Sequence, residues 1–565
     1  ISGAVVNVGL FVLVASPPSN SHCFRAIDTV SGTDASGKAK MLAMNNVLSV
    51  SQEAQQHHPD HRVLLDAVQS KSWLSDYASV YHGVSTTDYA RFGSNWWELS
   101  PELLDGDWIL RQSSFKDIGD YVGKEFCLFW GDDAAKIREL QSKGAAVVIT
   151  GLDAWGKQGV AVSQMGQLPA TLYVGTSFDD NLGVIIPNDM KHLPAIWAFC
   201  SSDEYRSRIR LVDQSIKVAY PTLLKVPFDL DRWQKVAAEK YPNGLPEPES
   251  DDPTQWLFHG RPEASTQPLQ AAVARTLGYR WPAELDSDMR LSTRARELVK
   301  KCEELLKFAD DDGIVCIPAV RGEEPASERL LAILATCGIK TDIDLDDWLR
   351  NTFFEEHCKL FHHRPFIWHI WDGRRRDGFH ALVNYHKLAE GNGKGKKLLE
   401  SLTYSYLGEW ISRQQDGVRR GEGGAEDRLA AATELQKQLI AIIDGQPPYD
   451  LFVRWKPLHQ QPIGWAPDIN DGVRMNIRPF MTANLSNGRT GAGILRWKPN
   501  IKWEKDRGTE PQRPKNEYPW FWGWDANTVD FTGGPEFKGE RFNACHYTHQ
   551  AKQQAREAAN KESVK

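Results

Sequence analysis

The sequence predicts a mixed α/β protein built from several domains, and three observations support this fold class. The chain has 565 residues, more than one domain of ordinary size holds. Apolar residues make up 41% of it and charged residues 25%, close to the average of globular proteins. Short Val- and Ile-rich runs, typical of strands, alternate with stretches whose apolar residues recur at helical spacing. Disordered, collagen-like and single-module proteins are therefore excluded.

The first expected element is the apolar run of residues 4–15, which is followed by turn residues at 16–19. A Val-rich run of this length is typical of a central strand of a parallel sheet, buried on both faces. It is too short to span a membrane, and no Lys or Arg precedes it as a secretory signal requires. Because the chain begins with Ile and one strand cannot stand alone, we expect residues 1–35 to be the C-terminal edge of an α/β domain whose main body lies upstream.

Two segments follow this edge. Residues 36–79 have apolar positions at helical spacing and predict a helical connector. Residues 80–240 predict a β-rich domain with a few helices, because short apolar runs lie between Gly, Asn and Asp turns. The strands expected there are residues 145–149, 171–174 and 183–187, and the helices are one after Pro194 and one over residues 203–216.

The second half of the chain is predicted to begin with a linker. Residues 242–254 are Pro-rich and acidic, so we interpret residues 241–340 as a Pro-rich linker and helical spacer. Residues 341–545 are the predicted C-terminal domain, loop-rich and dense in Trp from residue 446, and residues 546–565 are a tail helix. The further expected elements are amphipathic helices over residues 290–310 and 425–443 and flexible loops over residues 391–397 and 421–424.

Charge limits the partners that the chain can have. The net charge of −7 excludes a generally basic nucleic-acid coat. Residues 454–515 nevertheless carry twelve Lys and Arg against five Asp and Glu, which favours contacts with DNA phosphates by counterion release. The cations predicted to contact DNA in and around this stretch are Arg474, Arg496, Lys498, Lys502, Lys505 and Arg507.

Two further places carry candidate DNA contacts. Lys157, Gln158, Ser163 and Gln164 offer base-edge donors and acceptors on a short β element over residues 155–165. The alternative is that these polar residues only solvate a hairpin. Arg374 and Arg375 begin an Arg triplet in an expected exposed turn, where a phosphate clamp and a solvated triplet are equally consistent with the sequence.

The Cys and His residues do not predict a metal centre. Eight Cys are scattered without a C-x-x-C pair, which fits neither a disulfide framework nor a zinc ribbon and predicts a reducing, cytoplasmic location. Residues 356–358 together with His362 and His363 look like a metal cluster but lack paired ligand spacing. A histidine cluster that reaches into the core is the favoured interpretation. The Gly-Lys loop at residues 391–397 likewise lacks the spacing of a phosphate-binding loop.

No catalytic residue is predicted in this chain. Amino-group DNA methyltransferases use a [DNS]-P-P-[YFW] motif, in which a polar side chain and a prolyl carbonyl hold the flipped adenine. Residues 16–19 lack the aromatic ring, and residues 446–449 begin with Gln instead of a shorter polar residue. Asp530 with Glu536 and Lys538 faintly matches the D…E-x-K pattern of Mg²⁺-dependent nucleases, a pattern that arises often by chance.

Several long blocks resemble one family, the large N6-adenine DNA methyltransferases of type IIG restriction-modification enzymes and of the DISARM and BREX phage-defence systems, with the DISARM type closest. The blocks follow the family's order over most of the chain. Residues 83–92 resemble a G-x-x-T-x-D-N-x-x-F segment, although Tyr89 replaces the usual Asn. The other blocks are residues 3–11, 192–202, 222–230, 363–369, 468–480 and 498–508.

The resemblance implies a division of labour. Residues 1–35 would close a Rossmann-like methyltransferase sheet, and residues 80–240 would form a target-recognition domain. Adenine methylation with S-adenosylmethionine would take place in the upstream domain, while this half reads double-stranded DNA, in contact with that domain and with other defence-system subunits. Two alternatives stay open: a DNA endonuclease half of a type IIG enzyme, and a Trp-rich carbohydrate-binding protein.

Overall fold

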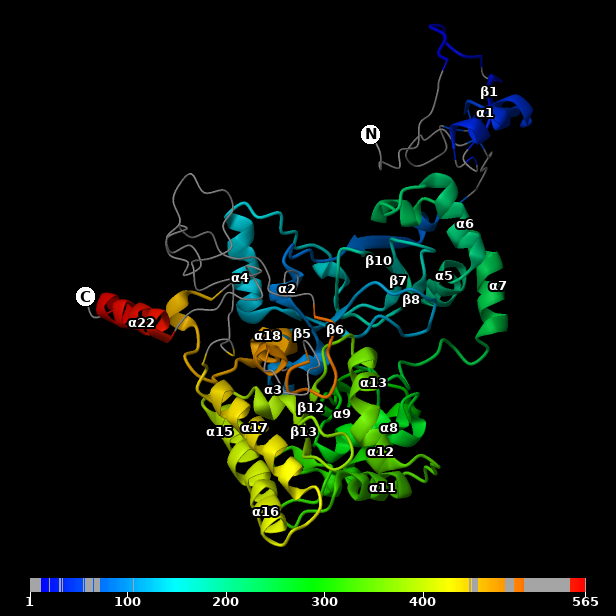
Figure 1. The fold of residues 1–565 in the computed structure, drawn as a ribbon. Helices are drawn as coiled ribbons and strands as arrows, with labels where there is room; N and C mark the ends of the chain where they lie inside the picture. The colour runs from blue at the N-terminus through cyan, green and yellow to red at the C-terminus, as the bar shows by residue number, and fades with distance from the viewer. Residues whose placement is uncertain are drawn as a thin grey trace. The chain divides into compact units, whose positions relative to one another are not determined.

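The computed structural model describes residues 12–53 except 20, 30–31 and 33, residues 72–482 except 105, 447–448 and 450–455, residues 492–501 and 549–563, and the single residues 55 and 65 (Figure 1). The described chain is mixed α/β with several small sheets, which confirms the fold class at that level. It divides into two compact units, each built from three stretches of chain. No helix within the described ranges is long and apolar enough to cross a bilayer.

The first unit comprises Ile1–Ser85, Gln112–Gly123 and Val148–Glu247. Its main sheet has the strand order β3-β10-β7-β8, and all neighbouring strands are antiparallel. The strands are β3 (Ala78–His82), β7 (Gly159–Ser163), β8 (Ala170–Tyr173) and β10 (Leu182–Pro187), with a short β9 (Ser177–Phe178) between them in sequence. Near the N-terminus, β1 (Cys23–Ala26) and β2 (Leu48–Ser51) form a separate antiparallel pair around α1 (Ala35–Met44).

Both faces of this sheet are covered along β7, β8 and β10, in which every residue is buried. Val160 and Val162 of β7 face a core that they share with the helices α5 and α7, whereas Ala161 faces a second apolar cluster. The period of two along a strand directs neighbouring side chains to opposite faces. The helical elements of the unit are η2 (Leu74–Asp76), η4 (Leu152–Ala154), η5 (Met190–His192), α5 (Leu193–Cys200), α6 (Asp203–Val212), η6 (Tyr220–Leu224) and α7 (Leu230–Lys240).

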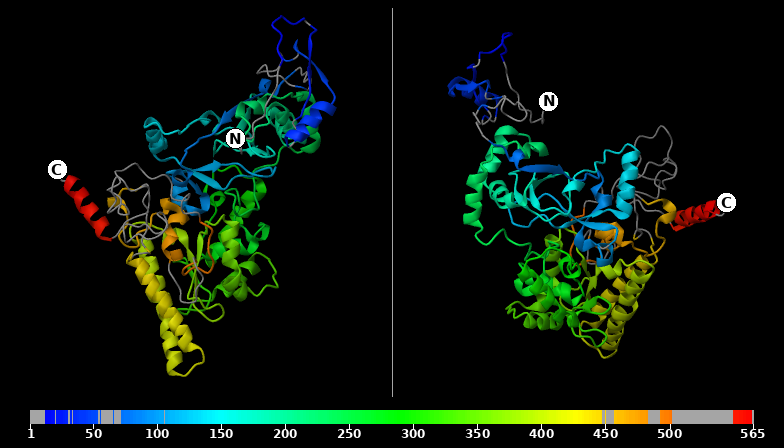
Figure 2. Two further views of the ribbon diagram at one scale, coloured as in Figure 1. Left: turned by 45° about the horizontal axis from the view of Figure 1, so that its top comes forward. Right: turned by 180° about the vertical axis from the view of Figure 1, so that it is seen from behind.

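The second unit comprises Thr86–Arg111, Lys124–Val147 and Pro248–Lys565. It contains an antiparallel sheet of order β11-β13-β12 and a second one in which β6 pairs with β4 and β5. These strands are β4 (Gly93–Asn95), β5 (Trp108–Gln112), β6 (Phe126–Phe129), β11 (Ile314–Cys316), β12 (Ile367–Trp371) and β13 (His380–Asn384). Two long helices, α16 and α17, pack side by side as a hairpin, as Figure 2 shows from two sides.

Helices make up most of the second unit. Its first helical elements are α2 (Tyr89–Phe92), η3 (Trp96–Glu98), α3 (Pro101–Leu104), α4 (Gly131–Ser142), η7 (Pro262–Ala264), α8 (Pro268–Thr276), α9 (Pro282–Leu285), α10 (Thr293–Lys301), η8 (Cys302–Phe308), α11 (Ala326–Thr336), α12 (Leu345–Asn351) and α13 (Phe353–Leu360). The later ones are α14 (Tyr385–Leu388), α15 (Lys394–Glu400), η9 (Ser401–Tyr406), α16 (Leu407–Arg419), α17 (Ala425–Ile443), η10 (Leu458–Gln460), η11 (Ile469–Asp471), α18 (Gly472–Asn476), α19 (Arg478–Thr482) and α22 (His549–Ser563).

The structure corrects three predicted elements. The strand expected over residues 145–149 is wrong, because only Val148 forms an isolated bridge, with Ser85. The loop expected over residues 391–397 is wrong in its second half, which begins α15 after Gly393 at φ 78°. The helix expected over residues 203–216 ends at Val212. Of the strand expected over residues 4–15, the structure describes only residues 12–15, which form no strand and are exposed.

Candidate nucleic-acid interface

The predicted reading element over residues 155–165 is the central strand β7 with its flanking turns. Lys157 is exposed and Gln158 half-buried, immediately before the strand. Ser163 and Gln164, at its other end, are each only 2% exposed, so the expectation that all four side chains are accessible is wrong for these two. Two neighbouring segments cover Gln164 and hydrogen-bond to its backbone. Its N–H donates to the Asn181 carbonyl (2.9 Å), and its own carbonyl accepts from the Val218 N–H (2.8 Å).

The turn between β7 and β8 presents other side chains. Leu168 has a φ of 52° and is fully buried, and its N–H donates to the Met165 carbonyl (3.1 Å). An apolar side chain held in the core fixes a backbone conformation that non-glycine residues rarely adopt. Met165 and Gln167 are therefore held out toward solvent. Sequence reasoning missed Gln167, although a Gly before it and a Pro two residues after it are turn signals.

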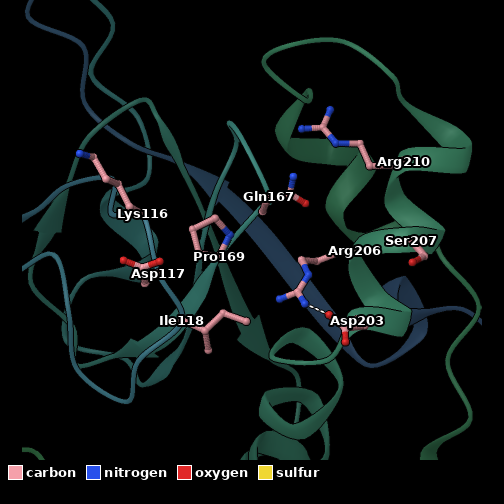
Figure 3. A pocket seen from close by; sticks show the side chains of 9 residues that line it. All are labelled: Lys116, Asp117, Ile118, Gln167, Pro169, Asp203, Arg206, Ser207 and Arg210. Atoms are coloured by element: carbon pink, nitrogen blue, oxygen red, sulfur yellow. Dashed lines mark ion pairs between the residues drawn. The ribbon is translucent and has the colours of Figure 1, made fainter. Parts of the chain in front are cut away.

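A cavity of about 620 Å³ lies beside this turn (Figure 3). It is confined to the first unit and is formed by the turn, helix α6 and a loop before residue 120. Its lining is mainly charged and polar, with two apolar side chains. The residues that line it are Lys116, Asp117, Ile118, Gln167, Pro169, Asp203, Arg206, Ser207 and Arg210.

Helix α6 brings its cations to this cavity for local reasons. Ser202 caps the helix by accepting from the Tyr205 N–H (3.2 Å). Arg206 pairs with Asp203 one turn earlier, as Figure 3 shows. Arg210 donates to the Gly166 carbonyl (2.6 Å) and so joins the helix to the β7–β8 turn. The cavity wall is therefore braced by the same arginine that lines it.

The basic C-terminal stretch is largely used by the fold where it is described. Lys456 pairs with Asp468 (2.8 Å) and Asp471 (2.9 Å). Arg474 and Arg496 are buried, so they do not present the accessible guanidinium that a phosphate contact needs. Lys498 is exposed. The other predicted contacts, Lys502, Lys505 and Arg507, lie outside the described residues.

Contacts with neighbouring residues stabilise the buried guanidinium of Arg496. Its Nε donates to the Arg350 carbonyl (2.7 Å), and Nη2 donates to the Asn351 amide oxygen (2.9 Å). Its guanidinium carbon lies 4.6 Å from the centroid of the Trp371 ring. A planar cation that stacks on an indole and donates in its plane is well satisfied without an anion.

The Arg triplet is divided between two roles. Arg374 makes two hydrogen bonds to Asp377 (3.1 and 2.8 Å), and this contact lowers the pKa of the Asp377 carboxyl. Asp372 accepts from the N–H groups of Arg374 and Phe379, which shapes the turn. Arg375 remains exposed and is the member of the predicted pair that is open to a ligand.

The histidine cluster reaches from the surface into the core, as the sequence favoured, with His362 exposed and His363 half-buried. His357 is fully buried, and burial lowers its pKa to about 3. His362 pairs with Glu125 (3.0 Å), which raises the His362 pKa, and His363 stacks on Trp497 with ring centroids 5.7 Å apart. Within the described ranges no three His, Cys, Asp or Glu side chains are placed to hold a metal ion.

Most of the remaining catalytic candidates lie outside the described residues. Residues 16–19 are exposed and belong to no helix or strand. Pro447 and Pro448 of the second Pro-Pro site fall outside the described residues, as do Asp530, Glu536 and Lys538.

Two of the family-like blocks contact a segment that follows a third block, within the core of the second unit. Trp97 lies five residues after the block that ends at Phe92, and its indole N–H donates to the Arg364 carbonyl (2.9 Å). Glu98 accepts from the Val473 N–H (2.9 Å). Trp97 and Glu98 are thus joined by hydrogen bonds to the blocks 363–369 and 468–480, at partners 267 and 375 positions later in the sequence.

Comparison with models of known protein families and with curated proteins gives no match to this chain. Its function therefore has to be inferred from its residues and their geometry.

Proposed function

We propose that this chain is the DNA-recognition half of a site-specific adenine-N6 DNA methyltransferase that acts in phage defence. One observation carries the proposal: two blocks that resemble this family, residues 363–369 and 468–480, both hydrogen-bond to the segment just after a third block, through Trp97 and Glu98. Short matches that arise by chance have no reason to contact one another. Segments that build one fold are expected to do so.

The first unit supplies the side chains that would face DNA in the proposed target-recognition domain. Lys157 and Gln158 precede β7, and Gln167 follows it. At about 3.3 Å per residue, the two ends of this five-residue strand are roughly 17 Å apart. Because the major groove is about 12 Å wide, one end can read base edges while the other reaches the backbone. Lys donates to base-edge acceptors, and Gln can both donate and accept. The end of β7 that carries Lys157 and Gln158 is therefore assigned to reading base edges.

Methyl transfer is assigned to the upstream domain, which would bind S-adenosylmethionine. No residue of this chain is assigned to that cofactor, because the sequence has no Gly-rich strand-loop that resembles an S-adenosylmethionine site. Calorimetric titration of the chain with S-adenosylmethionine is expected to give no binding heat. Stoichiometric binding at micromolar concentration would contradict this assignment.

Duplex binding tests the proposal itself. A fluorescent duplex is titrated with the full chain at several salt concentrations, and anisotropy is measured. We expect a dissociation constant of roughly 10⁻⁴–10⁻⁶ M near physiological salt and a steady weakening as salt rises, because phosphate contacts release counterions. A matched titration with an oligosaccharide serves as the control. Absence of duplex binding at low salt, or sugar binding that is insensitive to salt, contradicts the proposal.

A further inference from the structure

The cavity beside the β7–β8 turn has a charge imbalance that suits a single negative charge. Three cationic side chains line it, Lys116, Arg206 and Arg210, against the two carboxylates Asp117 and Asp203. The lining therefore keeps one positive charge. A phosphodiester carries one negative charge, whereas the phosphate of a free nucleoside monophosphate carries nearly two at neutral pH. The balance fits a phosphodiester better.

The three cations differ in how they are held. Lys116 is exposed and makes no hydrogen bond or ion pair within the part of the chain that the structure describes. Arg210 donates only to carbonyl oxygens, of Gly166 and Ser215, so its charge has no acidic partner among the described residues. Arg206 has one, but the Asp203 side chain is 90% exposed, and an ion pair in water contributes little.

The side chains of Lys116, Arg206 and Arg210 surround the same cavity. Arg206 and Arg210 are four residues apart on α6, so they lie on the same face of the helix. Figure 3 shows them on one side of the cavity and Lys116 on the other, with Gln167 between them. The guanidinium of Arg210 is fixed by its two carbonyl contacts. A fixed donor loses little conformational entropy when an anion binds.

We propose that this cavity is a phosphate site, filled by a backbone phosphodiester of the DNA that the chain reads. Arg206 and Arg210 donate to the phosphate oxygens from α6, and Lys116 approaches from the opposite loop. The site rests on the proposed function, because it fixes the register of the duplex against the reading side chains at the other end of β7.

Salt dependence of duplex binding tests the site. The variants are Lys116→Gln and the double variant Arg206→Gln with Arg210→Gln. Arg208→Gln is the matched control, because Arg208 lies on the same helix but pairs with Glu204 (2.9 Å) and does not line the cavity. Lys116 has no hydrogen-bond or ion-pair partner among the described residues, so its variant remains informative if the double variant is unstable.

Each lost phosphate contact is expected to reduce the slope of log affinity against log salt by about 0.9. Lys116→Gln should therefore bind duplex about eightfold more weakly at 0.1 M salt and equally well near 1 M, while Arg208→Gln keeps the original slope.

If the unmodified chain binds duplex and neither cavity variant changes the slope, the phosphate site is wrong and the proposed function stands. If the unmodified chain binds no duplex, the proposed function fails. Adenosine monophosphate at millimolar concentration provides the last arm: nucleotide binding that depends on Lys116, together with duplex binding that Lys116→Gln leaves unchanged, would assign the cavity to a free nucleotide and overturn the proposal.

Discussion

Replacing Arg496 distinguishes a structural cation from a DNA contact within the basic C-terminal stretch. In Arg496→Gln the two hydrogen bonds to Arg350 and Asn351 are lost, and so is the contact with the Trp371 ring. A hydrogen bond from a charged donor contributes about 1.5–3 kcal/mol, and a guanidinium over an indole about 0.5–2 kcal/mol. Since contributions within one site are not additive, we expect a loss of about 3–5 kcal/mol in the free energy of unfolding.

Two companion variants sharpen this prediction. Arg496→Lys keeps the charge, but a single ammonium cannot donate to both acceptors in the plane of a guanidinium, so it should recover only part of the loss. Lys498→Gln, two residues away at an exposed position, should change stability by no more than about 0.5 kcal/mol.

Urea unfolding followed by tryptophan fluorescence measures the stability, and duplex titration at several salt concentrations measures the DNA contact. The expected result is a lower urea midpoint for Arg496→Gln and an unchanged salt slope in whatever fraction remains folded. The opposite pair of results, an unchanged midpoint and a slope reduced by about 0.9, would show that Arg496 faces the phosphates and that the burial argument is wrong.

Three further predictions concern other parts of the chain. Glu284→Gln should cost about 3–5 kcal/mol in urea unfolding, because Arg275 would lose its buried charge partner (2.8 Å), and a loss below 1 kcal/mol would contradict this. In the full-length protein, which we propose to be a methyltransferase, Lys157→Ala with Gln158→Ala should relax the methylated motif, at about 1–3 kcal/mol for each lost base contact, without lowering the melting temperature. Gln164→Ala should instead destabilise the fold by about 1–2 kcal/mol. Methylome sequencing that returns an unchanged motif would assign Lys157 and Gln158 to the scaffold. His357 has a pKa of about 3 in the folded chain, below its unfolded value, so the stability that it provides is present above about pH 6.5 and is lost as the pH falls toward 3. His357→Gln should therefore flatten the stability-against-pH curve by up to about 1.4 kcal/mol per pH unit between pH 6 and 4, and an unchanged curve would place the titration elsewhere.

Elements with strong local signals could be predicted from the sequence. The helix expected over residues 425–443 is α17 (Ala425–Ile443), because it combines strong helix formers with an apolar stripe. The strand expected over residues 183–187 is within β10 (Leu182–Pro187). The run at residues 145–149 has the same apolar texture but pairs only at Val148. Strand formation there depends on a partner strand, which local composition does not specify.

The candidate interface was less predictable, because accessibility depends on distant partners. Arg496 is buried by Arg350 and Asn351, about 145 residues earlier in the chain. Gln164 is covered by segments that follow it by 17 and 54 residues. A count of charged or polar residues in a window contains none of this information. The proposed phosphate cavity could not be predicted for the same reason, because Lys116 and Arg210 come from segments that only the fold brings together.

Burial also changes how the chain could hold DNA. Of the twelve cations in residues 454–515, the structure describes Lys456, Arg474, Arg478, Arg496 and Lys498, and within this described set only Lys498 is exposed. Among the described residues, Lys498 and the three cavity cations would contribute about 3.6 to the salt slope, against about 11 if all twelve cations of the stretch met phosphates. A few phosphate contacts are enough to fix register, and they leave site choice to base-edge contacts. A measured slope near 3.6 would assign the rest of the affinity to base-edge contacts and to the proposed methyl-transfer domain, whereas a larger slope would assign further phosphate contacts to the cations of this stretch that lie outside the described residues.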